Sequence, residues 1–223
     1  MPTALIVQGG WQGHQPAEVA EIFARILRTE GFAVRVADTL EAYSEAGLAG
    51  VDLIVPLWTM GKLSKEQGAA LCAAVRERGV GLAGCHGGMC DAFREHTEYQ
   101  FMTGGQWVAH PGEDRVTYTV RVRDLEHVIT RGIEDFEVTS EQYYLHVDPA
   151  VRVLASTHFP TPGVEGPHVV NGSVEMPQVW TKGYGKGRVF YCALGHQASV
   201  FEIKEARELM RRELLWAAGI LGT

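Results

Sequence analysis

The chain has 223 residues, of which 46% are hydrophobic and 21% charged, a composition that is ordinary for a globular protein with one sizeable core. The formal charge of −7 argues against a nucleic-acid partner. The N-terminal residues contain neither a basic segment nor a long apolar run, so we expect no signal peptide, no membrane span and a cytoplasmic protein. The four cysteines, Cys72, Cys85, Cys90 and Cys192, form no CxxC pair and fit reduced thiols in that compartment.

The first 90 residues alternate between predicted strands and predicted helices. Apolar runs predict buried strands over 4–7, 32–37, 52–58 and 80–84. Apolar residues at helical spacing from Val19 to Leu27 predict a helix over 16–29. Ser64 and Gln67 form a capping box that begins a second helix over 64–78. This alternation is typical of an α/β protein, in which helices cover both faces of a mainly parallel sheet.

The middle of the chain has a different pattern. Residues 115–123 alternate apolar and polar side chains and predict a half-exposed strand, and 151–157 predict another, between long loops over 104–112 and 158–174. We interpret 104–175 as a β-rich insertion of antiparallel strands and loops that covers one edge or the mouth of the sheet. Strands over 178–182 and 188–193 and a last helix over 203–218 then complete a single domain that spans 1–223.

A glycine-rich segment, Gly84-Cys85-His86-Gly87-Gly88, follows the strand at 80–84. Glycines on both sides of a central residue are what a sharp strand-to-helix elbow requires, because side chains would clash there. His86 is the central residue, and Cys85 comes one position early, as the buried last residue of the strand. The same glycines also fit a turn that carries no chemistry.

Several histidines follow strands whose carboxyl ends would meet at one edge of the sheet. Ligands of open parallel sheets bind at that edge. His14, with Trp11, follows the first strand; Trp58 ends the third; His86 and His196 follow two later strands. We therefore expect His14, His86 and His196 to converge in one cleft. The insertion adds further polar and aromatic candidates: His110, Glu141, Tyr143, Tyr144 and His146.

Two kinds of chemistry fit these side chains. Imidazoles suit proton transfer to and from hydroxyls and carbonyls, with His86, His196 and Glu141 as the catalytic groups. Alternatively, His14, His86 and His196 hold a divalent metal such as zinc, although no HxH or HxxxH pair exists and the ligands would come from distant segments. The remaining candidates would bind substrate together with His14: Trp11, Trp58, His110, Tyr143, Tyr144, His146 and Trp180. Six aromatic side chains offer flat faces on which sugar rings can stack, although core packing is expected for at least half of them: Trp11, Trp58, Trp107, Tyr143, Tyr144 and Trp180.

The elbow, the pair His110-Pro111, the segment Glu141-Gln142-Tyr143-Tyr144 and the block Gly187-Arg188-Val189-Phe190-Tyr191 with Leu194-Gly195-His196 resemble the ThuA-like family, named for trehalose utilisation. The resemblance spans nearly the whole chain. It implies a flavodoxin-like three-layer sandwich related to class I glutamine amidotransferases. It also implies a role in the catabolism of trehalose, a related disaccharide or a 3-keto-glycoside.

The chain departs from the amidotransferase pattern, which has a cysteine at the elbow and a glutamate after the last histidine. Here the elbow centre is His86, and Gln197 follows His196, so we exclude glutamine amidotransferase activity. Three hypotheses remain. The first is an enzyme, a hydrolase or lyase, that acts on a glycoside derivative through acid-base or metal-assisted chemistry. The second is a non-catalytic sugar-binding or sensing module, and the third is a hydrolase with Cys85 as nucleophile. A homo-oligomer is left open.

Overall fold

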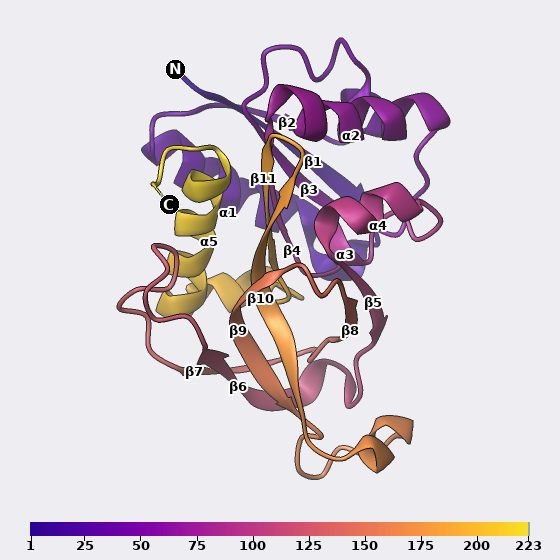
Figure 1. Cartoon of the computed structure of the whole chain (residues 1–223), viewed down its shortest axis with the longest axis vertical. Coiled ribbons are helices and arrows are strands. Elements are labelled where there is room, and N and C mark those ends of the chain that lie inside the picture. Colours follow the sequence, from indigo (N-terminus) through magenta and orange to yellow (C-terminus); the bar gives the residue numbers. More distant parts are fainter. Residues whose placement is uncertain (223) are drawn as a thin grey trace.

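The computed structural model describes residues 1–222, and its centre is a nine-stranded sheet (Figure 1). The strands lie in the order β2 (Ala33–Ala37), β1 (Thr3–Gly10), β3 (Leu53–Thr59), β4 (Gly81–Cys85), β11 (Gly187–Cys192), β10 (Val174–Tyr184), β9 (Arg152–Phe159), β6 (Val116–Val122) and β7 (Phe136–Ser140). Neighbours from β2 to β11 run parallel, and neighbours from β11 to β7 run antiparallel. The flavodoxin-like α/β fold is therefore as predicted, with a mixed sheet.

Helices cover both faces of the parallel half. The helices α1 (Pro16–Thr29) and α5 (Lys204–Ala217) pack on one face, and α2 (Lys65–Arg78) packs on the other with the short helix α4 (Thr97–Thr103) (Figure 1). Alternate residues of β1 feed these two cores, since Ile6 packs with α1 while Leu5 and Val7 pack with α2. The predicted capping box of Ser64 and Gln67 begins α2.

The insertion extends the sheet as well as covering its mouth. Strands β6, β7 and β9 continue the central sheet, whereas β5 (Gly105–Ala109) and β8 (Tyr144–Val147) form a separate two-stranded sheet. The segment 104–112, for which the sequence predicts a loop, is mostly β5. Gly104 and Gly105 at the start of this five-residue strand and Pro111-Gly112 shortly after its end hide its pattern. Its pairing with β8 contains a register shift.

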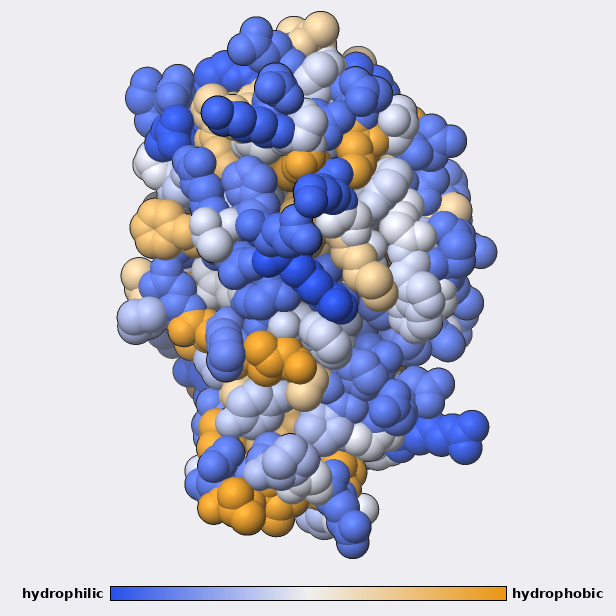
Figure 2. Space-filling view, turned by 90° about the vertical axis from the view of Figure 1, so that its right-hand side faces the viewer, coloured by the Kyte–Doolittle hydropathy of each residue, from blue (hydrophilic) through white to orange (hydrophobic). Residues whose placement is uncertain are grey.

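The space-filling view shows a mostly hydrophilic face with apolar atoms at its lower end (Figure 2). The loop between β9 and β10, which carries the 3₁₀-helix η4 (Pro167–Asn171), projects at that end in Figure 1 and exposes Val169 and Val170. None of the helices in the described part of the chain combines the length and the apolar character that crossing a membrane requires. All four cysteines are free and buried.

Candidate metal centre and cavity

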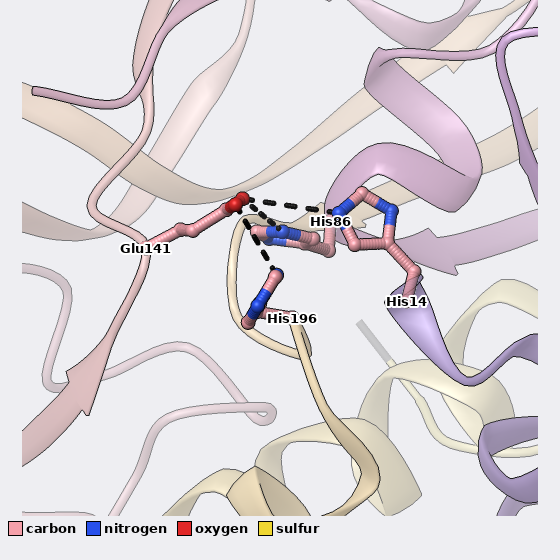
Figure 3. A group of neighbouring side chains, drawn as sticks. All are labelled: His14, His86, Glu141 and His196. Carbon is pink, nitrogen blue, oxygen red and sulfur yellow. Dashed lines mark hydrogen bonds and ion pairs between the residues drawn. The ribbon is translucent and has the colours of Figure 1, made fainter. Parts of the chain in front are cut away.

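Four side chains from four separate segments meet at the carboxyl edge of the parallel strands (Figure 3). His14 ends the 3₁₀-helix η1 (Gln12–His14) after β1, His86 begins the short helix α3 (His86–Cys90) after β4, and His196 follows β11. Glu141 follows β7 and reaches the three histidines from the insertion. All four are buried, none more than 8% exposed, and one potential ligand atom from each lies within 4.8 Å of the others.

The carboxylate of Glu141 is the centre of this cluster. Its Oε2 lies 3.0 Å from Nε2 of His86 and 3.8 Å from Nε2 of His14, and its Oε1 lies 3.4 Å from Nδ1 of His196. The hydroxyl of Tyr118 donates a hydrogen bond of 3.0 Å to the backbone carbonyl of Glu141, which fixes the loop that presents the carboxylate. The insertion thus supplies the one anionic group of the cluster.

The elbow that presents His86 has the predicted geometry. The backbone of His86 is left-handed, with φ of +48°, which costs energy for a residue with a side chain. The two glycines after it leave no room for side chains. A Cβ at Gly87 would lie 2.5 Å from Cε1 of His14, and one at Gly88 would lie 2.8 Å from Cα of Leu57. The imidazole is further fixed by stacking on the ring of Tyr143, with centroids 3.9 Å apart.

The hydrogen bonds of His86 define its protonation. Nδ1 lies 2.7 Å from the carbonyl oxygen of Ala193, which can only accept, so Nδ1 donates its proton there. Burial lowers the pKa of His86 to about 4, although Glu141 opposes the shift, so the ring is neutral near pH 7 and Nε2 carries a lone pair.

Two hydrogen-bond acceptors therefore face each other at 3.0 Å, the lone pair of His86 Nε2 and the carboxylate of Glu141. The other two histidines add to this arrangement. Nδ1 of His14 is 2.7 Å from the hydroxyl of Thr59, which leaves Nε2 directed at the cluster. Nδ1 of His196 is buried and has no hydrogen-bond partner within residues 1–222. A cation among these atoms would satisfy all four at once.

The donor set fits a divalent transition metal. Three imidazole nitrogens and one carboxylate oxygen are ligands that zinc and its first-row neighbours accept. Metal-bound histidines commonly donate their second nitrogen to a carbonyl or hydroxyl, as His86 does to Ala193 and as His14 can to Thr59. His14, His86 and His196 are the ligands that the sequence predicts, and Glu141 completes the set.

A cavity of about 280 Å³ opens beside the cluster, and both His14 and Glu141 form part of its wall. Of the predicted substrate-binding and stacking residues, five line it: Trp11, His14, Trp107, His110 and Tyr143. Nε2 of His110 lies 4.0 Å from Oε1 of Glu141. The complete lining consists of Trp11, His14, Thr59, Met60, Asp91, Arg94, Trp107, His110, Glu113, Glu141 and Tyr143.

The structure places four other candidates outside the cavity lining. Trp58 packs against Gly9 and Gly61, and Tyr144 packs edge-on against Phe159. His146 is exposed on β8. Trp180 is fully buried and donates a hydrogen bond of 3.0 Å to the carbonyl oxygen of Thr103. Trp58, Tyr144 and Trp180 thus pack within the protein, in line with the expectation that at least half of the aromatic candidates do so.

Several lining residues were missed by the sequence analysis, foremost Thr59, Asp91 and Arg94. Thr59 follows Trp58, and because neighbouring residues of a strand point to opposite faces, it is Thr59 that meets His14. The alternating direction of side chains along β3 could have shown this. Asp91 and Arg94 lie in the irregular segment after α3, where no periodic pattern exists.

Cys85 lies where the sequence indicates, as the buried last residue of β4. Burial, with a smaller contribution from Glu213, raises the pKa of its thiol well above the ordinary value. A thiol in that state is a poor nucleophile near neutral pH.

The order of the parallel strands, the elbow after β4 and the clustered histidines at the carboxyl edge of the sheet define an α/β protein of the flavodoxin-like class. The chain belongs to the ThuA family, described as trehalose utilisation, whose family model matches residues 3–217. Among the curated proteins, no match is found.

The likeness to solved structures with the same fold covers 97–100% of this chain. A protein described as ThuA-like from Parabacteroides merdae is 19% identical with a TM-score of 0.77, over 100% of this chain and 92% of that one. Another from Bacteroides uniformis is 18% identical with a TM-score of 0.73, over 97% and 91%. A β-galactosidase from a Rahnella species is 14% identical with a TM-score of 0.62, over 99% of this chain and 32% of that longer one. At such identities these likenesses show the fold alone.

Proposed function

We propose that this protein is an enzyme that acts on a carbohydrate derivative, such as trehalose, a related disaccharide or a 3-keto-glycoside, with a divalent metal ion bound by His14, His86, Glu141 and His196. The observation that carries the proposal is the convergence of four buried ligand atoms within 4.8 Å of one another, with Nε2 of His86 and Oε2 of Glu141 only 3.0 Å apart. Membership of a family described as trehalose utilisation supports a carbohydrate as the ligand.

Such an ion, when bound, polarises a carbonyl or hydroxyl oxygen of the substrate. The chain's own residues provide the rest. Glu141 neutralises part of the ion's charge, and the hydrogen bonds to Ala193 and Thr59 orient two of the imidazoles. Because His14 and Glu141 border the cavity, a substrate oxygen can approach the cluster from that side. His110 presents Nε2 to a substrate hydroxyl on the same side.

The experiment compares turnover of trehalose and of its 3-keto derivative by zinc-loaded protein, by protein treated with a chelator, and by the Glu141→Gln variant. Glu141→Gln keeps the size of the side chain and removes the charge. We expect turnover of at least one compound and a loss of about 100-fold or more in the variant and after chelation.

Two results would contradict the proposal. Turnover that survives chelation and Glu141→Gln would remove the metal from the reaction. Binding of the sugars without any turnover would favour the second candidate, a sugar-binding or sensing module, which keeps the cavity but not the chemistry.

A further inference from the structure

The cavity wall away from the metal ligands carries a rigid polar group of its own. Arg94 donates two hydrogen bonds to Asp91, from Nε to Oδ1 at 2.6 Å and from Nη2 to Oδ2 at 2.9 Å. The guanidinium carbon of Arg94 lies 4.9 Å from the ring centroid of Trp107. Asp91 is buried, and all three side chains line the cavity. We call Asp91, Arg94 and Trp107 the arginine wall.

This wall is suited to an uncharged ligand. The buried carboxylate of Asp91 neutralises the guanidinium, so the wall offers hydrogen bonds without a net charge that would favour an anion. Nη1 of Arg94 has no hydrogen-bond partner within residues 1–222 and remains available to a ligand. A planar guanidinium held by Asp91 and packed over the Trp107 ring suits neighbouring hydroxyl oxygens.

The backbone is strained at several positions around the cavity as well as at the elbow. Five non-glycine residues of the described chain have a left-handed φ: Gln15, Met60, His86, Phe93 and Glu113. Met60 and Glu113 line the cavity, Phe93 lies between Asp91 and Arg94, and Gln15 follows His14. Met60 donates its backbone N–H to Asp91 O, and Phe93 donates to Met60 O, both at 2.8 Å. Strain of this kind concentrates at functional sites, and here it includes the segment that carries the arginine wall.

The size of the cavity limits what it encloses. Its 280 Å³ lies just below the range of about 300–1,000 Å³ typical of small-molecule sites. Two large apolar side chains at its lining are exposed, Trp11 by 47% and Met60 by 41%. A ligand larger than one sugar ring would therefore extend from the cavity and contact these two residues.

We propose that the arginine wall binds the hydroxyl groups of one uncharged sugar ring, so that the substrate is a neutral glycoside with its second sugar or aglycone outside, against Trp11 and Met60. This inference rests on the proposed function and deepens it by assigning the charge and placement of the substrate. Arg94 is then a specificity-determining residue that contacts the substrate but not the metal.

The test measures binding to zinc-loaded protein by isothermal titration, with trehalose as the neutral probe and glucose 6-phosphate as the anionic one. Arg94→Lys keeps the positive charge and loses the planar fork. Arg76→Lys on α2 is a matched control, because Arg76 also pairs with a carboxylate and its side chain is equally exposed, 44% against 45%. Asp91→Asn leaves the guanidinium without its counter-charge.

We expect wild-type protein to bind trehalose more tightly than glucose 6-phosphate. Arg94→Lys should weaken trehalose binding by about 10-fold or more, and Arg76→Lys should not change it. Asp91→Asn should raise the affinity for glucose 6-phosphate relative to trehalose by about 10-fold, a change in preference that mere loss of structure would not produce. Zinc content, measured in parallel, should stay constant in all variants.

Equal trehalose binding by the Arg94→Lys and Arg76→Lys variants would overturn the inference. Tighter binding of glucose 6-phosphate by the wild type would also overturn it, yet would leave the proposed carbohydrate function intact. If zinc-loaded wild type bound neither probe nor any other sugar, the carbohydrate function itself would fail, and the inference with it.

Discussion

His86 shows how one residue combines backbone and side-chain constraints at this site. Its left-handed φ turns the chain sharply after β4, and its Nδ1–H donates to Ala193 O. Together these two constraints point Nε2 toward the carboxylate of Glu141, 3.0 Å away. The second ring nitrogen of each histidine is therefore as important as the first, because it decides which lone pair faces a metal.

The hydroxyl of Thr59 orients the imidazole of His14 in the same way, and a substitution of Thr59 tests this role. Thr59→Val keeps the shape of the side chain and removes the partner of Nδ1, so His14 can take either tautomer. We expect zinc affinity to fall by about 10–100-fold, measured by competition with a chromophoric chelator. Thr117→Val, which removes a threonine pair exposed on β6, is the control. Equal zinc affinity in the two variants would show that Thr59 has no such role.

At the scale of elements, the packing of α3 on β3 depends on Gly88. A Cβ there would lie 2.8 Å from Cα of Leu57 and 3.2 Å from its carbonyl carbon, both of which belong to the backbone of a central strand. Gly88→Ala should lower the free energy of unfolding by about 1–3 kcal/mol, measured by urea denaturation. At Gly183 in β10 a Cβ meets nothing within 4 Å, so Gly183→Ala should leave stability nearly unchanged. A Gly88→Ala protein as stable as that control would disprove the packing argument.

A buried glutamate in α5 makes the stability of the protein depend on pH. Both carboxylate oxygens of Glu213 are buried without a hydrogen-bond partner in the described chain, and burial raises its pKa well above the ordinary value. The unfolded chain releases this proton above about pH 4.3, while the folded chain keeps it. The free energy of unfolding therefore falls as the pH rises above that value, up to the folded-state pKa.

Glu213→Gln removes this titration. We expect its stability relative to wild type to increase by up to about 1.4 kcal/mol per pH unit between about pH 5 and 8, measured by urea denaturation. Glu137→Gln, at an exposed position of β7, should show no such trend. A difference between Glu213→Gln and wild type that does not change with pH would mean that Glu213 is ionised in the folded protein.

The elements and the candidate cluster were predictable to different degrees. The convergence of His14, His86 and His196 followed from the rule that parallel strands end at one edge, and the glycines marked the elbow. The strand β5 was hidden because its flanking glycines resemble a loop. The arginine wall was not predictable, since Asp91 and Arg94 meet Trp107 only through the tertiary path of an irregular segment.

At the scale of the whole molecule, the site is assembled from both halves of the sheet. The parallel half contributes three histidines, and the antiparallel insertion contributes the carboxylate and much of the cavity wall. Glu141 follows His86 by 55 positions and reaches it only because β6 and β7 extend the central sheet. Metal binding should therefore couple the two halves, since an ion held only in the folded state adds to its stability.

Elemental analysis of the protein is the most direct test of the metal centre. The protein would be purified without a histidine tag, saturated with zinc and dialysed, and compared with the Glu141→Gln and His196→Gln variants prepared in the same way. We predict one zinc ion per chain in the wild type and loss of zinc from both variants, with the fold retained by circular dichroism. A wild type that retains no zinc, or variants that retain as much as the wild type, would contradict the assignment of His14, His86, Glu141 and His196 as metal ligands.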